Sequence, residues 1–310
     1  MPLPKRLPGP GTIGLIAPSG HISDPEILDA AIARLEQRGW RVKEGACVRK
    51  KWKYFSAVDT ERVAELHDMA FDPEVDVVMA VRGGYGLSRL LGMIDYAALA
   101  ASRKVFCGFS DFTALNLALF ARTNYISLSG PLARVDFGEG DVHPLMEENF
   151  WPLLTGATHE TPLIASEHGY PDQSVEGIVW GTNLTVACHL IGTPYFPNVP
   201  NGILVAEDIG EEPYHVERCF MQLKHAGVLD QQRAIVLATF NGFETDSEVA
   251  KRLSMADVAE TLRKIAPCPV LTGFPFGHAA EKISLPIGGL GRIDITSAGY
   301  RLAFSDYNAD

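Results

Sequence analysis

Short apolar segments alternate with segments of helical periodicity along the first part of the chain. We expect strands where the apolar run is short and rich in β-branched residues, at residues 12–18, 40–42, 75–81 and 104–109. We expect helices where apolar residues recur every three or four positions, at residues 25–38, 60–71, 87–94 and 112–121. Residues 75–81 form the continuous apolar run VDVVMAV, typical of a strand covered on both faces. The alternation predicts a parallel sheet with helices on both faces.

The pattern changes between residues 155 and 174, a polar stretch rich in turn formers. We interpret residues 1–154 as an N-terminal α/β domain, 155–174 as a linker and 175–310 as a second domain. In the second domain we expect strands at 176–180, 202–206 and 234–239, and helices at 183–191, 214–226 and 247–265. The segment IDITSAGYRLAF is expected to form a hairpin that turns near Ala298-Gly299.

Composition and charge exclude several classes of protein. The chain has 310 residues, 46% of them hydrophobic, which suffices for a sizeable core. Its 27 Lys and Arg against 38 Asp and Glu give a net charge of −11, which argues against binding nucleic acid or an anionic membrane. We find no apolar run of transmembrane length and no secretory signal pattern. The five widely spaced cysteines suit reduced thiols, so we expect a cytoplasmic protein.

We expect neither a metal nor a cofactor. Gly9, Gly11 and Gly14 have the GxGxxG spacing, but they follow a Pro-rich segment and precede a strand. The dinucleotide fingerprint must instead follow a strand and open a helix. The nine histidines are scattered, and the cysteines form no CxxC pair.

Ser110 is the first candidate for chemistry. It follows an apolar strand and directly precedes a helix, in the context CGFSDF. A serine on such a turn can be a nucleophile exposed above a sheet, with helix N–H groups near a developing oxyanion. The G-x-S-x-G motif is incomplete, because Phe112 stands in place of the second glycine. A helix N-cap is the simpler interpretation of this serine, and it stays open here.

Arg82-Gly83-Gly84-Tyr85-Gly86 is the second candidate. It follows the strand at 75–81, and ligands bind at the carboxyl ends of parallel strands. Its glycines let the backbone approach a ligand, and Arg82 is free to hold a carboxylate, so we expect substrate contacts from Arg82, Gly83 and Tyr85. The alternative is an ordinary tight turn with a surface arginine.

Two residues of the second domain complete a possible triad. Glu207 ends an apolar strand in ILVAEDIG, and His278 lies on a Gly-flanked loop in GFPFGHAA. Each residue alone is weak evidence for catalysis, since an acidic pair often caps a helix and a lone histidine is usually solvated. Together with Ser110, they give a nucleophile, a base and the carboxylate that orients the base. We expect them to meet in a cleft between the domains.

The sequence resembles the LD-carboxypeptidases, which are serine peptidases of bacterial cell-wall recycling. The matching segments run through most of the chain: LIAPSG (15–20), AVRGGYGLSRLL (80–91), CGFSDFTA (107–114), LSGP (128–131), WGTNL (180–184), LIGTP (190–194), residues 201–229, FGH (276–278) and SLPIG (284–288).

The resemblance implies a fold, a reaction and a set of residues. It implies an N-terminal flavodoxin-like or Rossmann-like parallel-sheet domain and a smaller C-terminal α/β domain of swivelling type. It implies a cytoplasmic homodimer that cleaves terminal D-alanine from murein tetrapeptides without metal or cofactor. Ser110 is then the nucleophile, Glu207 the acid and His278 the base. The N–H groups of Asp111 and Gly84 would form the oxyanion hole.

Two other functions remain possible at this stage. One is a hydrolase of the microcin C self-immunity type, which acts on aminoacyl-adenylate analogues with the same kind of triad. The other is a muropeptide-binding module without catalysis. The sequence also leaves open whether the third residue of the favoured peptide is meso-diaminopimelate or lysine.

Overall fold

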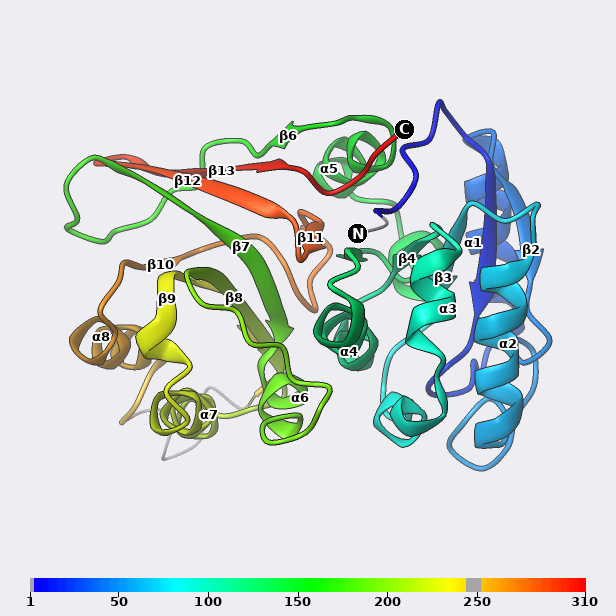
Figure 1. Cartoon of the computed structure of the whole chain (residues 1–310), viewed down its shortest axis with the longest axis horizontal. Coiled ribbons are helices and arrows are strands. Elements are labelled where there is room, and N and C mark those ends of the chain that lie inside the picture. Colours follow the sequence, from blue (N-terminus) through cyan, green and yellow to red (C-terminus); the bar gives the residue numbers. More distant parts are fainter. Residues whose placement is uncertain (1–2, 244–251) are drawn as a thin grey trace.

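The computed structural model describes residues 3–243 and 252–310. In this part of the chain the strands form two sheets that lie side by side, each accompanied by helices (Figure 1). The α/β class with a parallel N-terminal sheet is confirmed.

The first sheet has the order β11-β5-β4-β3-β1-β2 among the described residues, and all neighbours are parallel except β11 and β5. Its strands are β1 (Thr12–Ile16), β2 (Arg41–Glu44), β3 (Val77–Ala80), β4 (Val105–Cys107), β5 (Ser127–Ser129) and β11 (Leu285–Ile287). Its helices are α1 (Pro25–Gln37), α2 (Asp59–Phe71), α3 (Tyr96–Ala101), α4 (Thr113–Thr123) and α5 (Pro144–Thr155).

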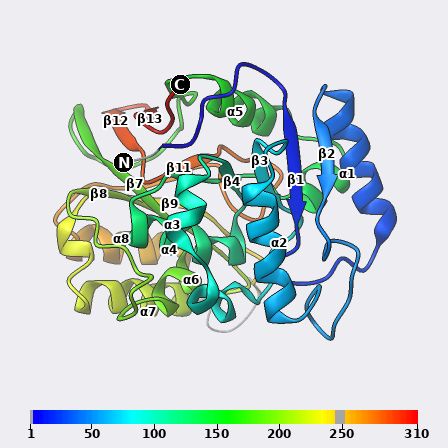
Figure 2. The same cartoon turned by 45° about the vertical axis from the view of Figure 1, so that its right-hand side comes forward.

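The order of these strands decides where a ligand can bind. From β1 the chain moves outward to β2 and then returns past β1 to β3. Because parallel crossovers are right-handed, α1 and α2 must lie on opposite faces of the sheet. Helices α2, α3 and α4 pack in a row, as Figure 2 shows. The chain therefore leaves β1 and β3 towards opposite faces of the sheet. The loops after these two strands meet at its carboxyl edge, where the Gly20 N–H donates to the Gly83 carbonyl at 3.4 Å.

Local sequence explains why these elements form. The Asp24 side chain accepts a hydrogen bond from the Glu26 N–H and caps α1, and Pro25 occupies its first turn. Leu28, Ala31 and Leu35 of α1 are buried at helical spacing.

The second sheet has the order β10-β9-β8-β7-β12-β13-β6 in the described ranges; β7 to β10 are parallel, and β12, β13 and β6 are antiparallel. Its strands are β6 (His159–Glu160), β7 (Gln173–Asn183), β8 (Gly202–Ile209), β9 (Gln232–Asn241), β10 (Val270–Thr272), β12 (Leu290–Thr296) and β13 (Gly299–Ser305). Its helices are α6 (Leu184–His189), α7 (Pro213–His225) and α8 (Met255–Ile265).

The chain crosses between the sheets more than once. Residues 155–174 carry β6, which pairs with β13 at the edge of the second sheet. After β10 the chain returns to the first sheet, where β11 pairs with β5. At the ends of the chain, Arg6 N–H donates to Ala309 O at 2.8 Å, and Ala309 N–H donates to Pro4 O at 3.0 Å. Residues far apart in sequence therefore hold the two sheets together.

Two predicted helices are wrong in extent or type. Residues 87–94 form two short 3₁₀ turns, Leu87–Arg89 and Leu91–Met93, instead of one helix. The helix expected at 247–265 begins at Met255, because the Ser254 side chain accepts from the Asp257 N–H and caps it there. Residues 247–251 of that prediction lie outside the described residues. None of the described helices is long and apolar enough to cross a membrane.

Candidate active site

Ser110 lies at the carboxyl end of β4 in a strained backbone conformation. Its φ is +62°, and it opens a 3₁₀ turn, Ser110–Phe112, that leads into α4. Gly108 before it is required, because a Cβ there would lie 2.7 Å from the Phe112 ring. Ser110 is not the N-cap of this turn, since Phe109 holds that position. The N-cap interpretation is therefore wrong, and the hydroxyl is free for another partner.

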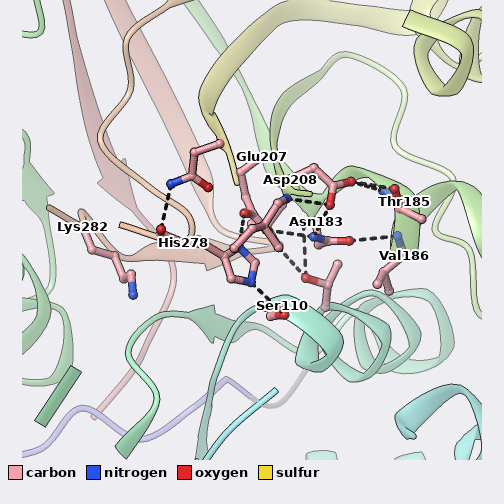
Figure 3. Close-up of polar contacts among 12 residues, drawn as sticks. Ser110, Asn183, Thr185, Val186, Glu207, Asp208, His278 and Lys282 are labelled. Carbon is pink, nitrogen blue, oxygen red and sulfur yellow. Dashed lines mark hydrogen bonds and ion pairs between the residues drawn. The ribbon is translucent and has the colours of Figure 1, made fainter. Parts of the chain in front are cut away.

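That partner is His278, on the loop that runs from β10 to β11. Its Nε2 lies 3.0 Å from Ser110 Oγ, and its Nδ1 lies 2.9 Å from Glu207 Oε2 (Figure 3). The loop crosses from the second sheet to the first, which brings the histidine over the end of β4. Asn241 at the end of β9 donates its side-chain N–H to the His278 carbonyl at 2.9 Å. This hydrogen bond to the backbone of His278 fixes the loop in addition to the two contacts of the imidazole.

Glu207 lies within β8 and is fully buried. Burial raises the pKa of its carboxyl above the usual value, and the hydrogen bond to His278 opposes that shift. Gly277 has φ +129°, and a Cβ there would lie 2.9 Å from Glu207 Oε2. Only glycine therefore lets the loop that carries His278, called the histidine loop below, pass so close to this carboxylate.

Asn183, at the end of β7, is a site residue that the sequence prediction missed. Its side-chain amide donates to Glu207 Oε1 at 3.2 Å and to Asp208 Oδ1 at 3.0 Å. Asp208 Oδ2 accepts from the N–H and hydroxyl of Thr185, at 2.9 and 2.7 Å. The adjacent carboxylates of β8 are thereby tied to the start of α6 (Figure 3). The signal available in sequence was an asparagine that ends an apolar strand, in WGTN.

The glycine-rich turn after β3 lies against Ser110. A Cβ on Gly83 would lie 2.9 Å from Ser110 Oγ, so the two segments touch. Gly84 has φ +105°, and a Cβ there would meet the Tyr54 hydroxyl at 2.6 Å. Arg82 donates to the His21 carbonyl at 2.7 Å. Gly83 and Gly84 thus lie where a side chain would collide with Ser110 or Tyr54.

Asp111 connects the turn at Ser110 with the glycine-rich turn after β3 through its buried side chain. Its Oδ2 accepts from the Ser19 hydroxyl at 2.5 Å and from the Leu87 N–H at 2.9 Å. Burial raises the pKa of this carboxyl, and these hydrogen bonds oppose the shift. The residue after the nucleophile thus anchors the glycine-rich turn with its side chain, leaving its own N–H near Gly83.

A cavity of about 800 Å³ opens over Ser110 and His278. Arg82, Gly83 and Gly84 line it, whereas Tyr85 does not and packs its ring 5.9 Å from Phe55. The rest of the lining comes from the segment after β5, α5 and the loops that follow β8 and β10: Leu132, Arg134, Val135, Asp136, Glu139, Gly140, Asp141, His143, Met146, Ile209, Ala279 and Ala280, with Phe109 beneath. Within residues 3–243 and 252–310, no three His, Cys, Asp or Glu side chains gather as they would around a metal ion.

The chain is similar to known proteins over most of its length. The LD-carboxypeptidase N-terminal domain matches residues 13–130, and the LD-carboxypeptidase C-terminal domain matches residues 176–293. The probable murein peptide carboxypeptidase of Bacillus subtilis is 35% identical over 287 residues, 92% of this chain and 89% of that protein. The microcin C7 self-immunity protein MccF of Escherichia coli is 30% identical, covering 82% of this chain and 81% of that protein.

Solved structures agree as well. The crystal structure of muramoyltetrapeptide carboxypeptidase from Oxalobacter formigenes superposes with a TM-score of 0.90 at 37% identity, covering 96% of this chain and all of that one. Both halves of this chain, their order and their fold therefore match the same serine peptidases. The chain belongs to the LD-carboxypeptidase family.

Proposed function

We propose that this protein is a serine-type LD-carboxypeptidase that releases the terminal D-alanine of murein tetrapeptides. The observation that carries the proposal is the hydrogen-bonded series Ser110–His278–Glu207 beneath an open cavity. Such a series turns a serine hydroxyl into a nucleophile, because the imidazole accepts its proton. The relatives named as murein peptide carboxypeptidases suggest the substrate.

The reaction is an acyl transfer in two steps. His278 Nε2 accepts the Ser110 proton while Oγ attacks the carbonyl carbon that links the diamino acid to D-alanine. His278 then gives this proton to the leaving amine of D-alanine, and the acyl group stays on Ser110. Water attacks the acyl-enzyme as His278 accepts its proton, and the tripeptide acid leaves as that proton returns to Ser110.

Glu207 has a separate task in this scheme. Its carboxylate accepts the Nδ1–H of His278, which keeps Nε2 free to face Ser110. The same carboxylate stabilises the imidazolium that forms in each step. Asn183 supports the charged form by donating to the other carboxylate oxygen.

The backbone beside Ser110 suits the oxyanion. We assign its stabilisation to the N–H groups of Asp111 and Gly84, because the turns that carry them meet at Ser110 Oγ through Gly83. We assign Arg82, at the cavity wall, to binding the free carboxylate of D-alanine. Its guanidinium donates to the neutral carbonyl of His21, which leaves its positive charge available to a substrate carboxylate. Arg82→Ala should raise KM at least about tenfold on the tetrapeptide. Unchanged kcat and KM would remove Arg82 from the substrate site.

The decisive experiment compares the purified protein with its Ser110→Ala variant. Each is incubated with the free murein tetrapeptide, and D-alanine release is followed by mass spectrometry. Release by the native protein alone supports both the reaction and the nucleophile. Equal release by both proteins would require another nucleophile.

Two other outcomes point to the competing functions. A native protein that leaves the tetrapeptide intact but cleaves an aminoacyl-adenylate analogue would be a hydrolase of the MccF kind. Binding of the peptide without cleavage of either compound would indicate a muropeptide-binding module. Arg82, Arg134, Glu139 and Asp141 line the cavity and offer charges of both signs to the charged groups of a peptide.

The family resemblance adds proposals about organisation and location. We propose a homodimer, which sedimentation would test, and a cytoplasmic location, which the five free cysteines suit. We also retain the division into domains at 1–154 and 175–310, joined by 155–174. Limited proteolysis between these ranges would test it.

A further inference from the structure

The segment after β5 forms part of the wall of the cavity over Ser110 and His278. Residues Ala133–Gly138 make one turn of π-helix, and residues 139–143 continue along the cavity. π-Helical turns occur rarely and are frequent at functional sites, because they re-aim side chains. The reaction at Ser110, His278 and Glu207 does not use this turn, so the presence of its charged side chains in the cavity wall needs another explanation.

This wall is held rigidly. Arg134 N–H donates to the Val81 carbonyl at 2.9 Å, next to Arg82. Asp136 accepts from the Leu132 N–H at 2.7 Å and from Lys282 Nζ at 2.6 Å. Both charged side chains of that pair are almost fully buried, at 3% and 0% exposed. The turn is thus fixed to the glycine-rich turn on one side and to the histidine loop on the other.

What the rigid wall presents to the cavity is a pair of opposite charges. Arg134 Nη2 lies 2.5 Å from Glu139 Oε1, and their side chains are 28% and 40% exposed. An exposed ion pair of this kind adds little to stability. It can therefore open easily for a ligand that offers a partner to each charge.

We propose that Arg134 and Glu139 form a subsite for a zwitterionic amino-acid end, a carbon that carries both a carboxylate and an ammonium group. Arg134 binds the carboxylate and Glu139 binds the ammonium. This inference rests on the proposed function, in which the acyl side of the substrate carries a diamino acid. The side chain of meso-diaminopimelate ends in such a carbon, whereas the side chain of lysine ends in an ammonium group alone. The subsite therefore selects diaminopimelate at the third position.

The test uses three synthetic tetrapeptides that differ only at the third residue. They carry meso-diaminopimelate, meso-diaminopimelate with its side-chain carboxylate amidated, or L-lysine. We expect the native protein to prefer the first over the other two by about 10- to 100-fold in kcat/KM, the effect of one charge-assisted contact. Equal kcat/KM for all three would overturn the subsite while leaving the proposed function intact. Release of D-alanine from none would overturn the proposed function itself.

Variants assign the selection to the two side chains. Arg134→Gln should bring the ratio of diaminopimelate to lysine peptide close to one. Glu139→Gln should lower kcat/KM for all three peptides, because each carries the ammonium group. Arg49→Gln is the matched control, since Arg49 pairs with Glu44 and Asp29 elsewhere on the surface. An unchanged ratio in Arg134→Gln, or unchanged kcat/KM for all three peptides in Glu139→Gln, would overturn the assignment.

Discussion

The nucleophile and the base of this site are held in place by different means. Ser110 takes its position from the backbone of one turn, with φ +62° and a glycine two residues before it. His278 takes its position from side chains of distant elements: Glu207 of β8, Asn241 of β9 and the packed ring of Phe109, whose centroid is 5.0 Å away. The turn is determined by a few consecutive residues, whereas the histidine loop depends on contacts from the whole fold.

This difference reflects the task of each region. The nucleophile must stand above a sheet edge, and a tight turn achieves that locally. The base must reach it from the other sheet, on a loop that runs from β10 to β11. A long crossing loop loses conformational freedom when ordered, so strong contacts must fix it. Changes to those contacts should therefore alter activity more than changes of backbone strain at Ser110.

The largest effect is expected from Glu207→Gln. The glutamine amide can present its N–H to His278 and favour the tautomer that turns the Nε2 proton towards Ser110. We expect kcat to fall about 10³- to 10⁴-fold with KM little changed. Steady-state release of D-alanine measures this, with Glu260→Gln on the surface of α8 as control. A fall below tenfold would mean that Glu207 does not orient the base.

The next largest effect should come from Lys282→Met. Lys282 Nζ lies 3.9 Å from the centroid of Phe109 and binds the buried Asp136, so its loss leaves an unpaired buried charge. We expect a loss of about 3–5 kcal/mol in the free energy of unfolding. Denaturant titration measures it, with the exposed Lys264→Met as control.

A double variant separates stability from positioning in this region. Lys282→Met with Asp136→Asn removes both charges while keeping an acceptor for the Leu132 N–H, so most of the lost stability should return. Activity should remain about tenfold reduced in kcat, because the histidine loop has lost its link to the wall. Recovery of both stability and kcat would limit Lys282 to a structural role.

The same contrast explains how much the sequence could predict. The turns at Ser110 and Gly83 were singled out because strand and turn residues are consecutive there. Glu207 and His278 were singled out because each follows an apolar strand, and the family resemblance then assigned their roles. Asn183, Lys282 and Asp136 escaped prediction, since their partners lie 24 to 146 positions away in the chain. A buried lysine is also unexpected from its residue type alone.

The fold shows the same division between local and distant effects. Strands β1, β3 and β8 were predicted because their apolar runs are continuous. Strand β11 and the pairing of β6 with β13 were not predicted. These strands have only three and two residues, and each forms only by pairing with a strand distant in sequence. Helix α8 was predicted too long, since the capping box at Ser254 was overlooked.

A buried carboxyl of the N-terminal region, outside the active site, makes the stability of the protein depend on pH. Glu65 of α2 accepts from the Ala17 and Cys47 N–H groups, and burial raises its pKa from 4.5 to about 7. Between these values the folded protein holds a proton that the unfolded chain has lost, so stability falls as pH rises through this window. The total fall is about 3 kcal/mol.

Glu65→Gln should remove this pH dependence. The variant loses one backbone hydrogen bond at every pH, because its amide N–H₂ cannot accept. From pH 4.5 to 7 its stability should fall by about 3 kcal/mol less than that of the native protein, since only the contribution of Glu65 is removed. Chemical denaturation across that range measures the difference, with the exposed Glu61→Gln one turn earlier as control. Parallel curves for the native protein and Glu65→Gln would show that Glu65 does not titrate in this window.

The smallest effect concerns the backbone strain at Ser110. A residue with a side chain costs roughly 1 kcal/mol in the left-handed region, whereas glycine adopts it freely. Both Ser110→Ala and Ser110→Gly lose the hydroxyl, so neither should release D-alanine. They differ in the Cβ of alanine, which is strained at φ +62° in the folded state but also lowers the entropy of the unfolded chain. We expect the glycine variant to be about 1 kcal/mol more stable than the alanine variant, a few degrees or less in Tm. If alanine were instead the more stable, the turn would not be strained, and the nucleophile would depend on its surroundings as much as the base does.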